Sequence, residues 1–139
     1  MVTKNACCIL MYRGYVLMVR ERHNKKWTVP GGGKDAGETD FEAMAREYRE
    51  ETGMRLPQLR QYKKVLYGFM GHTAIFIADN TYVNINGFRP NNEIDGIGWV
   101  PLQSLLRYNF SWFPSSAGLH EVRGVAQNSF RFLRKNGYL

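Results

Sequence analysis

Three consecutive glycines, at residues 31–33, separate a strand-like segment of this sequence from a helix-like one. The residues just before them, WTVP at 27–30, are typical of a short strand. After Thr39 the apolar residues recur at helical spacing and form one stripe: Phe41, Met44, Ala45 and Tyr48. This change of period across a glycine turn indicates that a strand leads into a helix, which favours a fold in which helices pack on a sheet.

The limits of this helix follow from its capping signals. Thr39 and Glu42 have the spacing of a capping box, in which each side chain bonds the backbone N–H of the other residue. Gly53 can adopt the left-handed conformation in which many helices end. We therefore predict a helix from about residue 40 to 52.

The rest of the chain alternates strand-like and helix-like segments. ACCILMY and YVLMVR predict a hairpin that turns at Arg13-Gly14. Further strands are predicted in KKVLYGFM, HTAIFIAD, TYVNI and GIGWV, at 63–70, 72–79, 81–85 and 96–100. A C-terminal helix that closes near Gly137 is predicted from the spacing of Leu119, Val122, Ala126, Phe130 and Leu133. A single α/β domain over residues 1–139, with a mixed β-sheet between helices, accounts for this order.

Acidic residues are concentrated on the first predicted helix, although the chain as a whole has a formal charge of +7. Glu47, Glu50 and Glu51 share one helix face, and like charges at this spacing cost about 0.2–0.5 kcal/mol per pair. A divalent cation would offset that cost, because Mg²⁺ and Mn²⁺ accept the hard oxygen ligands that carboxylates offer. The alternative is a solvated acidic face paired with Arg46 and Arg49.

The spacing around these acids closely resembles the Nudix box, G-x5-E-x7-R-E-U-x-E-E-x-G-U, in which U is a bulky aliphatic residue. Here the pattern runs from Gly32 through Glu38 to REYREETGM at 46–54, and every charged and glycine position is filled. Tyr48 stands where the family usually has Ile, Leu or Val, and we expect this change to affect the packing beneath the helix. The resemblance implies the Nudix fold, an α/β/α sandwich, and hydrolysis of a pyrophosphate linkage with Mg²⁺, or Mn²⁺, as cofactor.

The same resemblance implies which groups hold the metal ion. Glu50 and Glu51 match the principal metal ligands of the family. Glu47 matches a residue that either binds metal or acts as general base. A carbonyl of the glycine loop also binds metal in the family, and here it would belong to Gly31 or Gly32.

The resemblance also assigns supporting roles. Arg46 would hold the glutamates in position through a salt bridge, and Glu38 would have a structural or indirect role. A base that deprotonates water is needed as well, because the anionic oxygens of a diphosphate repel an incoming nucleophile. Glu93 lies in a loop where related enzymes often carry such a base, and Asp95 competes with it for this role.

The substrate is predicted less closely than the reaction. Arg20 ends the strand that leads toward the box, where the resemblance implies an arginine that contacts phosphate. Lys34, just after the glycines, would extend this positive rim, and we predict that both bind the substrate. The basic chain favours an anionic, pyrophosphate-containing substrate: a (d)NTP, a dinucleoside polyphosphate or the 5′ end of an RNA. One alternative is a diphosphoinositol polyphosphate phosphohydrolase, which the triple glycine suggests. Another is a non-catalytic Nudix-like module that binds a nucleotide or RNA.

The surroundings of the protein are predicted from what the sequence lacks. The only cysteines are the neighbours Cys7 and Cys8, which would point to opposite faces of a strand, so a disulfide between them is not expected. No apolar run has the length of a membrane span. We therefore expect a cytoplasmic protein with no membrane partner, either a monomer or a homodimer.

Overall fold

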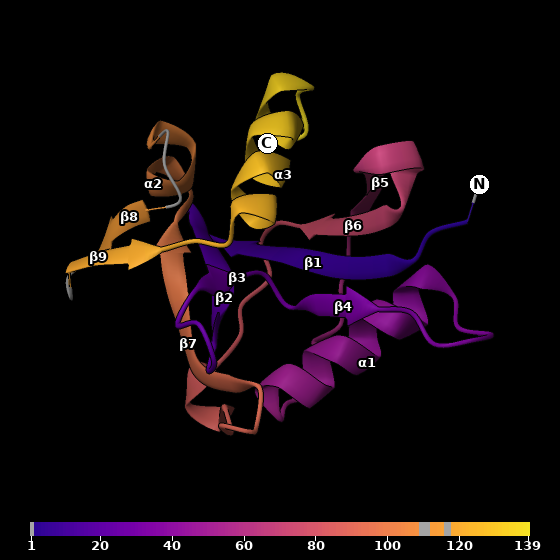
Figure 1. Cartoon of the computed structure of the whole chain (residues 1–139), viewed down its shortest axis with the longest axis horizontal. Helices are drawn as coiled ribbons and strands as arrows, with labels where there is room; N and C mark the ends of the chain where they lie inside the picture. The colour runs from indigo at the N-terminus through magenta and orange to yellow at the C-terminus, as the bar shows by residue number, and fades with distance from the viewer. Residues whose placement is uncertain (1, 109–111, 116–117) are drawn as a thin grey trace.

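In the computed structural model, which describes residues 2–108, 112–115 and 118–139, a seven-stranded mixed sheet forms the middle of the molecule (Figure 1). Its strands are β1 (Asn5–Tyr12), β2 (Tyr15–Glu21), β3 (Trp27–Thr28), β4 (Gly31–Gly33), β5 (Lys63–Tyr67), β6 (Thr73–Ala78) and β7 (Ile94–Pro101). Five of them run in the order β3-β2-β1-β6-β5, while β4 also pairs with β1 and β7 also pairs with β2. The β1–β6 pair is parallel, and the other pairs are antiparallel.

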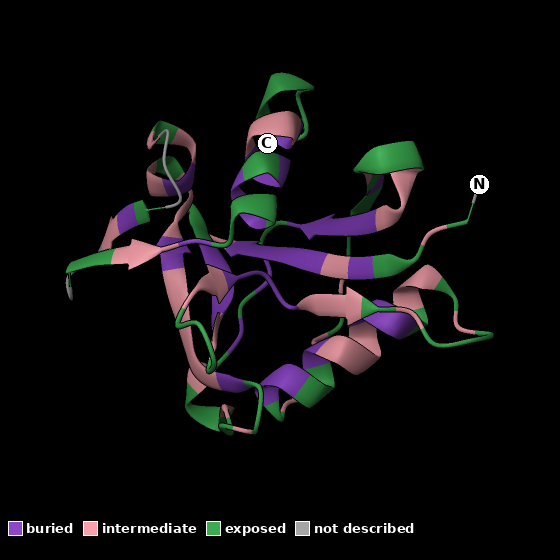
Figure 2. Ribbon diagram, in the orientation of Figure 1, coloured by how far each residue is buried: buried purple, intermediate pink, exposed green. Residues whose placement is uncertain are grey.

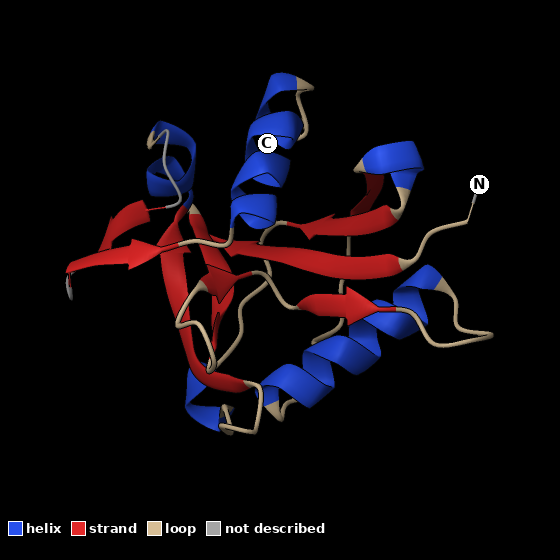
Figure 3. Cartoon of the chain, viewed as in Figure 1, coloured by secondary structure: helices blue, strands red, loops and turns tan. Residues whose placement is uncertain are grey.

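Helices cover both faces of this sheet (Figure 3). Helix α1 (Asp40–Thr52) lies on one face, and α2 (Leu102–Arg107) and α3 (Gly124–Lys135) lie on the other. The predicted α/β fold, with a mixed sheet between helices, is therefore confirmed. None of the helices in the described part of the chain is long and apolar enough to cross a membrane.

Strand β1 contributes side chains to both cores because successive residues of a strand point to opposite faces. Ala6, Cys8 and Leu10 pack in the core under α1. Ile9 and Met11 belong to the core under α2 and α3. Figure 2 shows that the buried residues follow the centre of the sheet and the inner sides of the helices. A strand buried on both faces explains why ACCILM is apolar throughout.

Helix α1 has the limits that its capping signals predict. Thr39 and Glu42 form the reciprocal capping box, and Gly53 ends the helix with φ 69°. Tyr48 is fully buried against the sheet, as expected from its place on the apolar stripe. The capping box thus fixes the point after the glycine loop at which the acidic helix begins.

The hairpin between β1 and β2 is also confirmed. Tyr12 pairs with Tyr15, and the turn residues Arg13 and Gly14 have φ of 50° and 80°. The strand predicted at 63–70 is shorter than expected: β5 ends at Tyr67, and Gly68, with φ 91°, leads into a 3-10 turn (η1, Phe69–Gly71).

The strand predicted at 81–85 is wrong. No strand is present in this segment, and a 3-10 turn (η2, Ile85–Gly87) follows it. The side chain of Asn84 accepts a hydrogen bond from the backbone N–H of Asn86. Such local bonds compete with strand pairing, so they outweigh the strand propensity of Tyr82 and Val83.

The C-terminal helix begins later than predicted. Leu119 lies in β9 (Gly118–Glu121), which pairs with β8 (Trp112–Ser115), and Val122 forms an isolated bridge with Trp27. Leu119 and Val122 match the helical spacing of the residues that follow them only by chance, so the spacing predicts too early a start for the helix. Only from Gly124 onward is the segment helical.

Candidate active site

Four glutamates from three parts of the chain line a cleft of about 470 Å³. Glu21 ends β2, Glu47 and Glu51 lie on α1, and Glu93 directly precedes β7. The glycines 31–33 form one wall of the cleft. We call this group of four glutamates and three glycines the acidic cleft.

Glu51 is the most deeply placed of these acids. Its side chain is buried, and its Oε1 accepts a hydrogen bond of 2.7 Å from the backbone N–H of Gly31. Burial is the main cause that raises the pKa of Glu51 to about 8; the hydrogen bond from Gly31 opposes this shift, and the charges of Glu47, Glu93 and Glu21 add to it. The carboxylate form of Glu51 therefore needs a positive charge nearby at neutral pH.

Glu47 lies directly against the glycine loop. A Cβ atom at Gly32 would come within 2.6 Å of the carboxyl carbon of Glu47, so any larger residue at this position must displace it. Partial burial raises the pKa of Glu47, while Arg46 opposes the shift. Close approach of the Glu47 carboxylate is the reason that this loop position needs glycine.

Arg46 connects the acids of α1 to the loop that precedes the helix. Its guanidinium donates hydrogen bonds to Glu38 at 2.8 Å, to Glu47 at 3.1 Å and to Glu50 at 3.2 Å. It also donates to the carbonyl oxygen of Gly33 at 2.8 Å. The hydrogen bond to Glu38 contributes most to a raised Arg46 pKa. The contacts match the positioning role that the family resemblance implies for Arg46, and its effect on activity stays a prediction.

Glu50 is the predicted metal ligand that the structure does not place in the cleft. Its side chain is 59% exposed and contacts Arg46. Within the described residues, no three acidic, histidine or cysteine side chains already surround a single point that suits a metal ion. The structure brings Glu47, Glu51, Gly31 and Gly32 together, and Glu50 would join them only after its side chain turns.

The donor set nevertheless fits a divalent cation. The cleft offers carboxylate oxygens that repel one another, beside a loop of glycine carbonyls, and hard cations such as Mg²⁺ prefer these ligands. A buried carboxyl group whose pKa is raised by three other acids is stabilised in its charged form when a cation lies among them.

Glu93 and Asp95 are separated by the structure into two different environments. Glu93 lines the acidic cleft. Asp95 instead accepts a hydrogen bond of 2.7 Å from Arg20 and pairs with Lys25, and these contacts lower the pKa of Asp95 to about 2. Arg20, predicted to bind phosphate, is thus engaged with Asp95. Of the two candidate bases, Glu93 alone faces the other acids.

Asn91 holds the segment that carries Glu93, although nothing in the sequence singled it out. Its side-chain amide donates to the backbone carbonyls of Glu50, at 3.1 Å, and Glu51, at 3.0 Å. Its Oδ1 accepts from the backbone N–H of Glu93 at 2.9 Å. Asn91 therefore fixes the distance between the end of α1 and the predicted base.

Lys34, the other predicted phosphate contact, supports the fold near the start of α1. Its ammonium group pairs with Asp40 at 2.9 Å and donates to Thr3 at 3.0 Å. Lys34 does not line the acidic cleft. Phosphate binding by Lys34 would require it to leave these partners.

Three residues of the cleft with acidic or basic side chains were missed by sequence reasoning: Glu21, His23 and Arg123. Glu21 directly follows Arg20 at the end of a predicted strand, so the alternation of side chains could have indicated it. Arg123 gave no signal, because it was assigned to the interior of a helix that in fact starts after it.

A smaller pocket of about 290 Å³ adjoins the acidic cleft and shares residues with it. The shared residues are Thr28, Val29, Gly31, Gly32 and Arg123. The remaining lining mixes apolar and polar side chains, among them Tyr67, Ile75, Ala126, Asn5, Thr73 and Ser129. We call it the side pocket.

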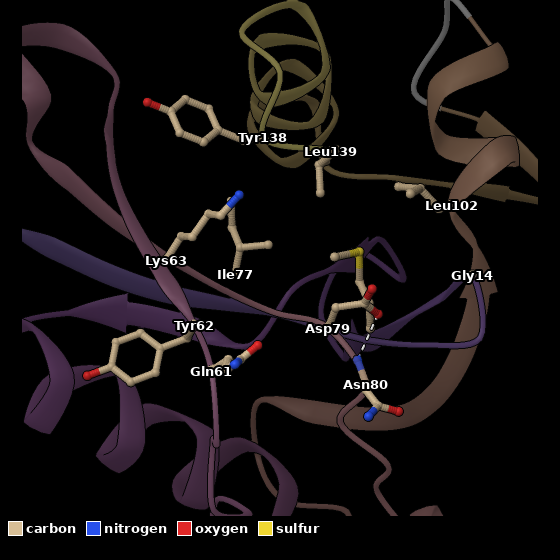
Figure 4. Close-up of a pocket in the computed structure, with 11 residues that line it drawn as sticks. Gly14, Gln61, Tyr62, Lys63, Ile77, Asp79, Asn80, Leu102, Tyr138 and Leu139 are labelled. Atoms are coloured by element: carbon tan, nitrogen blue, oxygen red, sulfur yellow. Dashed lines mark hydrogen bonds between the residues drawn. The ribbon is translucent and has the colours of Figure 1, made fainter.

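A hollow larger than the acidic cleft, of about 620 Å³, lies elsewhere (Figure 4). Met11, Ile77, Leu102 and Leu139 supply apolar lining, and Lys63 and Asp79 add charge. Asp79 is the one acidic side chain among the described residues that line it, and it accepts a hydrogen bond from the backbone of Asn80. We call it the large pocket.

Comparison with known proteins agrees with this architecture. A family model described as the NUDIX domain matches residues 1–117. The chain is 31% identical over 94 residues, 66% of its length, to an 8-oxo-(d)GTP phosphatase of Mycolicibacterium smegmatis. It is 40% identical over 50 residues, 36% of its length, to an RNA pyrophosphohydrolase of Francisella tularensis subsp. mediasiatica. The matched stretches span only 28% and 32% of those two proteins.

A solved structure shows the same fold over nearly the whole chain. The crystal structure of a MutT protein from Methanosarcina mazei Go1 superimposes with a TM-score of 0.63. The superposition covers 97% of this chain and 95% of the Methanosarcina mazei chain, at 21% sequence identity. At this identity the likeness concerns the fold alone.

Proposed function

Because the chain belongs to the Nudix family, we propose that it is a metal-dependent hydrolase of a phosphoanhydride bond, acting on a nucleoside diphosphate linked to another group. The observation that supports this most is the acidic cleft, in which Glu47, Glu51 and Glu93 are held together against their mutual repulsion. Functional sites are where such unfavourable charge clusters are retained.

The residues that would hold the metal ion are Glu51, Glu47 and Glu50, together with a carbonyl of Gly31 or Gly32. Mg²⁺ bound there would neutralise phosphate charge and make a bound water more acidic. Arg46 keeps Glu47 and Glu50 oriented through its hydrogen bonds. Gly31 fixes the Glu51 carboxylate through its backbone N–H.

Glu93 is our candidate for the general base. It lies in the cleft and faces the α1 acids, and its carboxylate can accept the proton of an attacking water. Asn91 positions its backbone relative to the end of α1. Glu47 is the alternative base, because it also lines the cleft and partial burial raises its pKa.

The side pocket supports a nucleoside as part of the substrate. It lies next to the glycine loop, and its mixture of Tyr67, Ile75, Asn5 and Ser129 suits an aromatic base with polar edges. The likeness to an 8-oxo-(d)GTP phosphatase and to an RNA pyrophosphohydrolase agrees with this range. A (d)NTP, a dinucleoside polyphosphate and an RNA 5′ end remain the candidate substrates.

A screen tests this proposal directly. A library of nucleoside polyphosphates, dinucleoside polyphosphates and triphosphorylated oligoribonucleotides is incubated with the protein and Mg²⁺, and released phosphate and pyrophosphate are measured. We expect turnover of at least one compound, lost in Glu51→Gln and on addition of EDTA. Binding without hydrolysis of any compound would instead favour a non-catalytic nucleotide-binding module.

Salt dependence separates the substrate classes. An RNA 5′ end places many phosphates on the basic surface and releases counterions on binding, whereas a (d)NTP meets only nearby charges. We therefore expect kcat/KM to fall steeply with added salt for RNA and modestly for a (d)NTP, at fixed free Mg²⁺. A flat response on both would separate the excess positive charge from substrate capture.

A further inference from the structure

Arg123 lines both the acidic cleft and the side pocket. It is the one arginine or lysine among the described residues that line either of them. A substrate whose phosphates lie at the glutamates and whose nucleoside lies in the side pocket must pass beside the residues that the two hollows share. Arg123 therefore stands where a phosphate chain would cross between them.

The backbone of Arg123 is fixed by two neighbouring contacts. Its N–H donates a hydrogen bond of 2.8 Å to the carbonyl of Trp27, and the preceding residue, Val122, forms a β-bridge with Trp27. Helix α3 begins at the next residue, Gly124. The base of the side chain is thus held at the wall of the cleft, while the side chain itself is 56% exposed.

The guanidinium of Arg123 has hydrogen-bonding capacity to spare. Its Nη1 lies 3.9 Å from Oε1 of Glu21, which is attraction without a hydrogen bond. That Glu21 oxygen is buried and has no hydrogen-bond partner among the described residues. A guanidinium offers five N–H donors, and phosphate oxygens accept them in pairs.

Other basic side chains near the cleft already have strong partners. Arg20 is bonded to Asp95, Lys34 to Asp40, and Arg46 to Glu38. Each would have to give up a charged partner in order to bind phosphate. Arg123 would give up only its long contact with Glu21.

We propose that Arg123 binds the phosphate chain of the substrate at the junction of the acidic cleft and the side pocket. This inference rests on the proposed function, and it gives a role to the one arginine or lysine among the described residues that line a cleft with four glutamates. Arg123 is a substrate-binding residue that selects ligands with phosphates at the junction, while the bond is broken at the glutamates.

Binding of inorganic tripolyphosphate in the presence of Mg²⁺, measured by titration calorimetry, tests the contact without turnover. We compare the parent with Arg123→Ala, Arg123→Lys and the control Arg134→Ala, an exposed arginine at the other end of α3. Loss of a charge-assisted pair predicts that Arg123→Ala weakens binding about tenfold. Arg123→Lys should lie between it and the parent, and Arg134→Ala should stay within about twofold of the parent.

Steady-state kinetics on a compound found in the screen provide the second measurement. Arg123→Ala should raise KM by about the factor by which it weakens tripolyphosphate binding, with a smaller change in kcat. Thermal unfolding of each variant shows whether it is folded, and Arg123→Lys keeps the test valid if the alanine variant is not.

The outcomes separate this inference from the proposed function. Parent-like tripolyphosphate binding by folded Arg123 variants, or no binding by the parent itself, overturns the role of Arg123 even if the protein hydrolyses nucleotides. Weakened binding in Arg123→Ala with no turnover of any compound by the parent supports the anion contact and refutes the hydrolase.

Discussion

The acidic cleft and the large pocket differ more in the chemistry of their lining than in their volume, and volume alone would favour the large pocket as the functional site. The large pocket has about 620 Å³ and the acidic cleft about 470 Å³. The larger space has apolar side chains such as Leu102 and Ile77 in its lining, with Asp79 as the one acid among its described residues (Figure 4). The smaller one holds four glutamates. The chemistry of the lining therefore identifies the site better than the volume does.

The difference also shows what each region costs the fold. Burial, together with the charges of Glu47, Glu93 and Glu21, raises the pKa of Glu51, so placing its carboxylate in the cleft opposes folding in the absence of a cation. Specific contacts from Gly31, Arg46 and Asn91 hold the acids of the cleft there nevertheless. The large pocket requires no such compensation. A feature that is both unfavourable and carefully supported is a better indicator of chemistry than an open space.

The largest expected effect separates the two regions by activity. Glu51→Gln keeps the size of the side chain and an acceptor for Gly31 but removes a charge at the proposed metal position. We expect it to lower kcat/KM at least about a hundredfold. Lys63→Ala, in the large pocket, should change it less than about twofold. Equal losses of kcat/KM in both variants would show that the acidic cleft is not the active site.

The next effect distinguishes two acids that are two residues apart. Glu93→Gln should lower kcat about a hundredfold with little change in KM, because the base is lost while binding remains. Asp95→Asn removes a partner of Arg20 outside the cleft and should change kcat less than about threefold. Steady-state kinetics at fixed Mg²⁺ decide the matter. The reverse ranking would transfer the role to Asp95, and small effects from both would favour Glu47.

A third test uses two neighbouring glycines of the cleft wall. Gly32→Ala places a methyl group where the Glu47 carboxylate lies, so displacement of that carboxylate should lower kcat at least about tenfold. A Cβ atom at Gly33 meets nothing within 4 Å, and Gly33→Ala should stay within about twofold of the parent. If both alanines are tolerated, close contact between the loop and Glu47 is not needed for turnover.

The smallest effect concerns the stability of the metal-free protein. The pKa of Glu51 is raised from 4.5 to about 8 in the folded chain, chiefly by burial. Between these values the unfolded chain releases a proton that the folded chain keeps, so stability falls as pH rises through this interval. Glu51→Gln lacks this loss and should melt about 5 °C above the parent at pH 8.

At pH 5 most of that advantage should disappear. This pH is close to the unfolded-state pKa of 4.5, so the folded and unfolded parent then differ much less in the protons that they bind. Melting curves in EDTA at the two pH values measure the difference. A variant that gains nothing at pH 8 would show that the buried carboxyl group does not oppose folding.

The sequence predicted the parts of the site that depend on local spacing. Helix α1, its capping box and the face shared by Glu47 and Glu51 follow from residues at most four positions apart, which helical geometry relates directly. The place of Gly32 beside them followed only from the resemblance to the Nudix box.

The remaining features depend on contacts that sequence spacing does not encode. Arg20 finds Asp95 through the pairing of β2 with β7, and Lys34 finds Asp40 and Thr3. The sequence does not show whether a basic side chain such as Arg20 or Lys34 is solvated or forms an ion pair. Arg123 was hidden because Leu119 and Val122 continue the helical spacing of the residues after it, and the pairing of β9 with β8 and the bridge between Val122 and Trp27 become visible only in the structure.

The hydrogen bond from Gly31 to Glu51 also bears on how the protein folds. It closes a loop of only 20 residues, and the bond from Arg46 to Gly33 closes one of 13. The contact of Arg20 with Asp95, near Glu93 in the sequence, spans 75 residues and can form only after β2 has paired with β7. Short loops close at lower entropic cost, so we expect α1 to gain hydrogen-exchange protection before β7 in a refolding experiment. A chain arrested between these events would already hold the proposed metal ligands Glu47 and Glu51 together, but Glu93, the proposed base, would not yet lie beside them.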